Sequence, residues 1–119
     1  MSGPPRLKSA IWAAAHVRRC FVAGLFAAVV KKGAEEAGAI FVMIDRLDGT
    51  ARLLGPAPGA SIADDGSRRW IDETQGFAPR SETLAILDRR KRSDPDLWIV
   101  EIEDKSGEGG FAGEVIVAD

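Results

Sequence analysis

The sequence predicts a single small α+β domain, in which a mostly antiparallel sheet of four to six strands packs against two helices. Three observations predict this class. Apolar residues recur at helical spacing near the amino terminus, several short apolar runs alternate with Gly- and Asp-rich turns, and a second helical segment ends before a proline. A chain of 119 residues also has the usual length of one domain. The expected order of elements is α-β-β-β-(β)-α-β.

The first helix is expected at Ser9–Val22. Ser9 is a favourable residue for capping a helix amino terminus, and Gly24 suits the left-handed conformation that often follows the last turn. One face of this helix is apolar, because hydrophobic side chains recur three or four residues apart along it. These side chains are Leu7, Ala10, Ile11, Ala14, Val17 and Phe21.

Two apolar runs, residues 25–31 and 39–44, are predicted to be central strands that the polar connection 32–38 joins as a hairpin. The Asp-Gly pair at 48–49 is a strong turn signal, so a returning strand is expected at 51–54. We expect both helices to pack on one face of this sheet. The central strands would then have an open second face, and a homodimer is expected to cover it.

The second half of the chain is predicted to add a helix and two strands. Residues 55–67 form a loop rich in Gly, Pro and Asp, and 68–73 are expected to be a short edge strand around a tryptophan. Ser81 is expected to cap the second helix and Pro95 to end it. Residues 97–103 alternate as a strand does, with Trp, Val and Ile on one face.

The domain boundaries follow from composition. Residues 1–6 contain Gly and two Pro and are predicted to be a loose arm, 7–104 form the domain, and 105–119 are a Gly-rich tail. The tail either adds a last strand or remains a tail. The apolar runs are far shorter than the roughly 20 residues that a membrane-spanning helix needs, and no signal peptide is recognisable. We therefore expect a cytoplasmic protein without a membrane segment.

Composition also limits the function. A net charge of −2 and a pI near 5.4 argue against nucleic-acid binding through the overall field of the domain. One Cys and one His exclude a disulfide within the chain and disfavour the usual Cys/His metal sites. We expect no metal and no cofactor.

Five segments between Leu7 and Glu103 carry a family resemblance. They are Leu7-Lys8-Ser9 with Trp12, Arg18-Arg19-Cys20, residues 32–42, residues 54–58 and residues 94–102. Together they resemble the short bacterial proteins grouped as the domain of unknown function 1491 family. The resemblance implies a short standalone bacterial protein and implies no activity, so it assigns no catalytic residue.

The connection 33–38 is the first candidate site. Its two glycines lie five residues apart, as in a phosphate-binding loop, but the Lys and the Ser or Thr that must follow the second glycine are absent. Glu35 and Glu36 could bind a divalent cation or act in acid–base chemistry. Adjacent side chains on an exposed connection rarely converge on one point, so a solvated turn is the favoured interpretation.

The second candidate is a stripe on the first helix. Trp12, His16 and Cys20 recur every four residues and therefore share one face, with Arg19 beside them. A thiol next to an imidazole could form a nucleophile–base pair. No further residue is placed to complete such a site, and buried cysteines usually pack as small hydrophobes. A packed or interface stripe is favoured.

A basic run at 89–92 is the third candidate, because it could contact phosphates. Four consecutive helical residues point around the whole helix, and cations are favoured near a helix carboxyl terminus in any case. A solvated surface is favoured here too.

Two functions of different class remain. The favoured one is a non-enzymatic binding or interaction module that recognises a protein or a small anion, with Arg18 and Arg19 among the contacts. The alternative is a small enzyme acting on a phosphorylated or nucleotide-like substrate. In that case the arginines would hold the anion and Glu35 or Glu36 would supply acid–base or metal chemistry.

Overall fold

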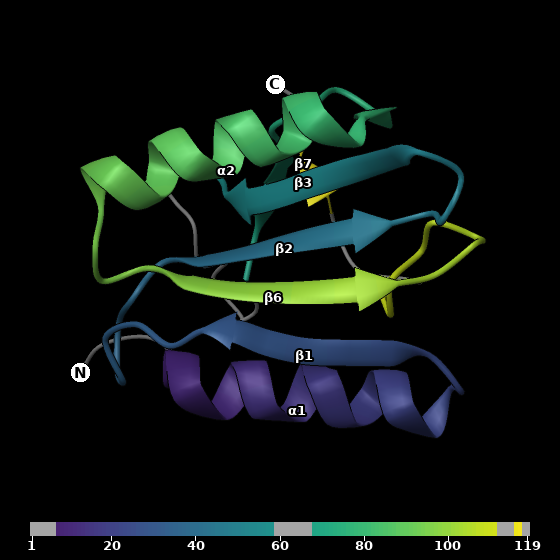
Figure 1. The fold of residues 1–119 in the computed structure, drawn as a ribbon. Coiled ribbons are helices and arrows are strands. Elements are labelled where there is room, and N and C mark those ends of the chain that lie inside the picture. Colours follow the sequence, from purple (N-terminus) through teal and green to yellow (C-terminus); the bar gives the residue numbers. More distant parts are fainter. Residues whose placement is uncertain (1–6, 59–67, 112–115, 118–119) are drawn as a thin grey trace.

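The computed structural model describes residues 7–58, 68–111 and 116–117, so the predicted arm at 1–6 lies outside the described residues. One sheet carries two helices, α1 (Ser9–Val22) and α2 (Arg80–Ser93) (Figure 1). The strands are β1 (Phe26–Lys31), β2 (Ile40–Asp45), β3 (Thr50–Pro56), β4 (Trp70–Asp72), β5 (Ala78–Pro79), β6 (Trp98–Glu103) and β7 (Ile116–Val117). Among the described residues, four of the six strand pairings are antiparallel. The α+β class and the predicted order of elements are confirmed.

The strand order corrects one prediction. It runs β1-β6-β2-β3-β4-β7, with β5 paired to β3. β1 and β2 therefore do not form a hairpin, because β6 lies between them, antiparallel to β1 and parallel to β2. The polar connection after β1 instead packs against the turn before β6, where the Ala34 N–H donates to the Asp96 carbonyl at 2.8 Å. The hairpin expected between β2 and β3 is confirmed.

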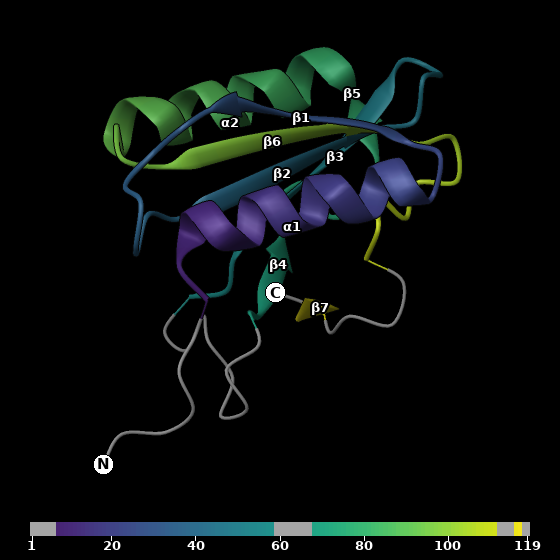
Figure 2. The same cartoon turned by 90° about the horizontal axis from the view of Figure 1, so that it is seen from below.

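The helices lie on opposite faces of the sheet, and the prediction that they share a face is wrong (Figure 2). Strand β6 shows the alternation that the sequence predicts. Trp98 and Val100 join the core under α1, whereas Ile99 joins the core under α2. The central strands are apolar on both faces, as is usual where a strand is covered on both sides. One helix on each face covers β2 and β6 within a single chain, so these two strands need no second copy, whereas Phe26 and Val30 of β1 remain exposed.

The two helix caps expected from the sequence are not formed. Ser9 is already the first residue of α1 and is buried, and its hydroxyl donates to the Gly38 carbonyl at 2.6 Å. Helix α2 begins at Arg80, directly after Pro79, so Ser81 lies inside it. Ser9 therefore fastens α1 to the connection between β1 and β2 instead of capping its own helix.

Candidate binding groove between α2 and β1

A bulge in β1 places two neighbouring side chains on the same face of the sheet. Val29 is opposite Val100 and Lys31 is opposite Ile99, so the ladder shifts by one residue at Val30. In a bulge, two residues of one strand oppose a single residue of its partner, and strict alternation is lost. Val30 and Lys31 both line a groove on the α2 face as a result.

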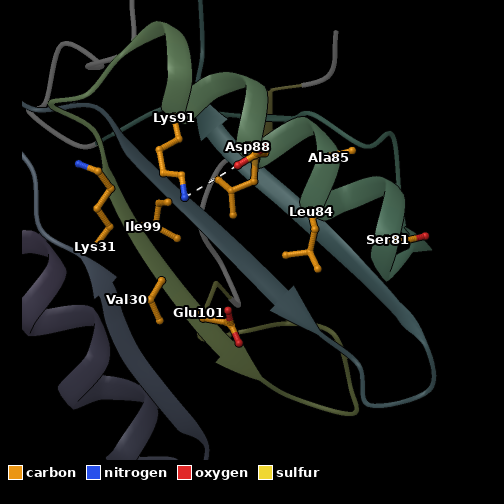
Figure 3. A pocket seen from close by; sticks show the side chains of 10 residues that line it. Val30, Lys31, Ser81, Leu84, Ala85, Asp88, Lys91, Ile99 and Glu101 are labelled. Carbon is orange, nitrogen blue, oxygen red and sulfur yellow. Dashed lines mark ion pairs between the residues drawn. The ribbon is translucent and has the colours of Figure 1, made fainter.

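The groove has a volume of about 730 Å³ and runs between α2 and β1 (Figure 3). Helix α2 packs mainly on β3 and touches β2. A helix about 10 Å wide covers roughly two strands spaced about 4.8 Å apart, which leaves β1 and the side of β6 next to it less covered on this face. The apolar side chains of the groove are Val30, Leu84, Ala85, Leu87 and Ile99, and its polar residues are Lys31, Ser81, Asp88, Lys91 and Glu101.

The charged residues of the groove are held by contacts within the chain. The Lys31 ammonium donates to two backbone carbonyls of the turn before β6, at 2.6 and 3.0 Å. Lys91 lies 3.9 Å from Asp88, and Glu101 lies 3.8 Å from Arg80. Because the groove carries two cationic and two anionic side chains beside its apolar residues, it suits apolar side chains better than a highly charged ligand.

The structure separates the residues that we predicted to bind a ligand. The backbone carbonyls of Glu35 and Glu36 accept hydrogen bonds from the first two residues of α1, both at 3.0 Å. Arg18 and Arg19 lie near the other end of that helix, about 13 Å further along at 1.5 Å per residue. Within one chain the two pairs do not form a common site. Glu35 lines a second cavity of about 350 Å³ between α1 and β1, together with Lys32.

The stripe of Trp12, His16 and Cys20 packs inside the chain. His16 and Cys20 are buried, and the imidazole ring stacks on Trp12 with the ring centroids 4.7 Å apart. Phe111 also contacts the imidazole, with the ring centroids 4.6 Å apart, and the Gly109 carbonyl lies 2.8 Å from Nε2. Sequence reasoning placed Gly109 and Phe111 in a tail, since nothing near them in the chain indicates contact with α1. The interface role of the stripe remains a prediction.

A turn after β6 carries Gly109 to His16. The Asp104 carboxylate accepts hydrogen bonds from the Gly109 N–H at 2.9 Å and from the Ser106 N–H and hydroxyl at 2.9 and 2.8 Å. Burial alone would raise the pKa of Asp104, but these donors favour the carboxylate and hold the pKa below its ordinary value. The turn is therefore organised around an ionised Asp104.

Cys20 is expected to be an unreactive thiol. Burial raises its pKa, although the nearby Arg19 charge opposes the rise, so the thiolate that attacks electrophiles is scarce at neutral pH. We expect Ellman's reagent to modify the folded protein at about pH 8 at least about 100-fold more slowly than the chain unfolded in guanidinium chloride, because reaction must await local opening. Equal rates in the two states would show that Cys20 is accessible and would reopen a nucleophilic role.

The fold and the groove define a class of protein, a small α+β domain with one helix on each face of its sheet and an open groove beside the second helix. The chain belongs to the family described as "Protein of unknown function (DUF1491)", whose pattern it matches over residues 7–112. No functionally curated protein matches it.

In the described ranges, no helix is long and apolar enough to cross a membrane, and no group of three or more His, Cys, Asp or Glu side chains is placed to hold a metal ion.

Solved structures of similar proteins agree with this assignment. A crystal structure of a DUF1491 family protein from Caulobacter crescentus is 37% identical, with a TM-score of 0.76, and the match covers 93% of this chain and 97% of that chain. A solution structure of a protein from A. tumefaciens is 44% identical, also with a TM-score of 0.76, over 96% of this chain and 99% of that chain. An NMR structure of a DUF1491 family protein from Caulobacter crescentus is similar to the same degree, at 37% identity and a TM-score of 0.76 over 96% of this chain and 99% of that chain.

Proposed function

We propose that the protein is a non-enzymatic interaction module and that the groove between α2 and β1 receives an amphipathic helix of a protein partner. The observation that carries this proposal is the pair of exposed apolar side chains, Val30 and Leu84, that line the groove beside α2. Val30 is 53% exposed and Leu84 is 37% exposed, although both border the buried Ile99. Half-exposed apolar side chains gathered in one groove are typical of a protein-binding surface.

The size of the groove supports a helical partner. Neighbouring helices on a sheet pack about 8–10 Å apart, and α2 occupies only the β3 side of its face. A partner helix packed beside α2 would lie over β6 and β1, which is where the groove runs (Figure 3). A partner helix with one apolar face would cover Val30 and Leu84, and its polar face would remain in water.

The enzyme alternative has less support, because its two sets of residues lie at opposite ends of α1. The cytoplasmic location expected from the sequence remains part of this proposal.

Site-specific crosslinking tests the proposal. A photoreactive benzoylphenylalanine at Leu84, inside the groove, is compared in the cells of origin with the same residue at Arg89. Arg89 lies on the same helix but lines a different hollow, away from β1. We expect one partner to crosslink from Leu84 and not from Arg89. The purified partner should then bind the Leu84→Asp variant at least about tenfold more weakly, because a buried charge replaces an apolar contact.

Equal crosslinking from both positions, or an unchanged affinity for Leu84→Asp, would show that the groove is not the binding surface. Circular dichroism of each variant establishes that a loss of binding is not a loss of folding, since Leu84 contributes little to the core.

A further inference from the structure

The outer edge of β1 is protected only at its carboxyl end, by the bulge at Val30 and by Lys31. β1 has the sequence Phe-Ala-Ala-Val-Val-Lys, and among the described strands it pairs only with β6. Exposed edges are normally short, interrupted by Pro, or charged along their length, since free backbone N–H and C=O groups otherwise pair with another chain. Residues 26–29 of β1 are apolar and keep a regular register with β6, so this part of the edge is suited to pairing.

Apolar side chains flank this edge on both faces of the sheet. On the α2 face, Phe26 and Val30 are 54% and 53% exposed. On the other face, α1 lies along β1 (Figures 1 and 2). Ala14 lines a cavity between these two elements. Phe21 follows Ala14 by seven residues and therefore lies on nearly the same flank of the helix. Phe21 is itself 58% exposed.

We infer that a second copy of this chain pairs with β1 through its own β1, antiparallel about a two-fold axis. A two-fold pairing joins the same patch on both subunits and closes both edges at once, whereas an open edge would continue to add chains. It also brings the two α1 helices side by side. The small residues Ala10 and Ala14 on the facing flank allow a close approach there.

The charges along α1 are complementary under this symmetry. Exposed Arg18 lies towards the carboxyl end of the helix, and exposed Glu35 lies against its amino end. An antiparallel arrangement therefore brings Arg18 of each copy towards Glu35 of the partner subunit. The two kinds of residue that are separated within one chain would meet twice across the dimer.

The dimer would also enlarge the proposed binding groove. Joining two β1 strands makes one continuous sheet, so each groove floor would extend onto the partner subunit, between the two α2 helices. This consequence rests on the proposed function, whereas the strand pairing itself does not.

Sedimentation equilibrium of the purified full chain tests the pairing. We expect a mass of twice 12.7 kDa at micromolar concentration. Arg18→Glu and Glu35→Arg should each weaken association at least about tenfold, because each places like charges together twice per dimer. The double variant Arg18→Glu/Glu35→Arg should restore it. Arg89→Glu, on the far side of α2, should leave association unchanged.

Phe26→Asp gives a second and independent test, since it places a charge beside the paired strands without touching the core. It should produce a folded monomer. A wild-type chain that sediments at 12.7 kDa at about 100 µM would overturn the dimer, and so would a dimer that is insensitive to all of these substitutions. A monomer that still crosslinks from Leu84 would reject the dimer alone, whereas a confirmed dimer without that crosslink would reject only the proposed function.

Discussion

Replacing Gly33 with alanine is expected to lower the free energy of unfolding by about 3 kcal/mol or more. A Cβ atom at this position would collide with the backbone carbonyl oxygens of Asp96 and Leu97, the second at 2.5 Å. These carbonyls cannot move away easily. The Ala34 N–H donates to the first at 2.8 Å, and the Lys31 ammonium donates to the second at 3.0 Å. Urea denaturation followed by tryptophan fluorescence would measure the loss.

The matched control is Ala37→Ser, because Ala37 is exposed in the same connection. A surface substitution of this kind should change the free energy of unfolding by less than about 0.5 kcal/mol. If Gly33→Ala unfolded at the same urea concentration as the wild type, the connection would have to be free to move away from β6. The close approach of this connection to the turn before β6 would then be incorrect.

Replacing His16 with alanine is expected to cost about 3 kcal/mol. The substitution removes a ring that packs against both Trp12 and Phe111, and it leaves the buried Gly109 carbonyl with only the weak Cys20 thiol donor at 3.8 Å. For a domain of this size the melting temperature should fall by roughly 10–15 °C. Thermal unfolding followed by circular dichroism at a fixed pH would measure it.

Two further variants separate the contributions at His16. His16→Gln retains an N–H donor and should recover part of the lost stability. Ala15→Ser changes an exposed position on the same helix and should cost less than about 0.5 kcal/mol. Equal melting temperatures for His16→Ala and Ala15→Ser would mean that the contact with Gly109 contributes nothing to folding.

Features that depend on neighbouring residues could be predicted from the sequence. The alternation of β6 and the Asp-Gly turn after β2 are both present in the structure. The expected caps at Ser9 and Ser81 were wrong, because Ser9 forms a hydrogen bond to Gly38, 29 residues away, and α2 begins after Pro79. A local signal fails where a distant group competes for the same side chain.

The candidate site was less predictable. The groove depends on the bulge at Val30, on Leu84 from α2 and on Ile99 from β6, and these residues are far apart in the chain. No spacing rule joins them. The enzyme alternative placed Glu35 and Arg18 in one site because of their charges, yet they lie at opposite ends of α1. Exposure and charge can be estimated from the sequence, but proximity cannot.

The sequence by itself determined the element types, their order along the chain and the absence of a disulfide within it. Only the tertiary structure decided that β6 separates β1 from β2, that each face of the sheet carries its own helix, and that a groove remains beside α2. The reason is that helix and strand periodicity are set by residues within a few positions of each other. Strand order instead depends on which apolar faces, distant in sequence, bury the most surface when they pack together. The free energy of that burial is a property of the whole folded chain.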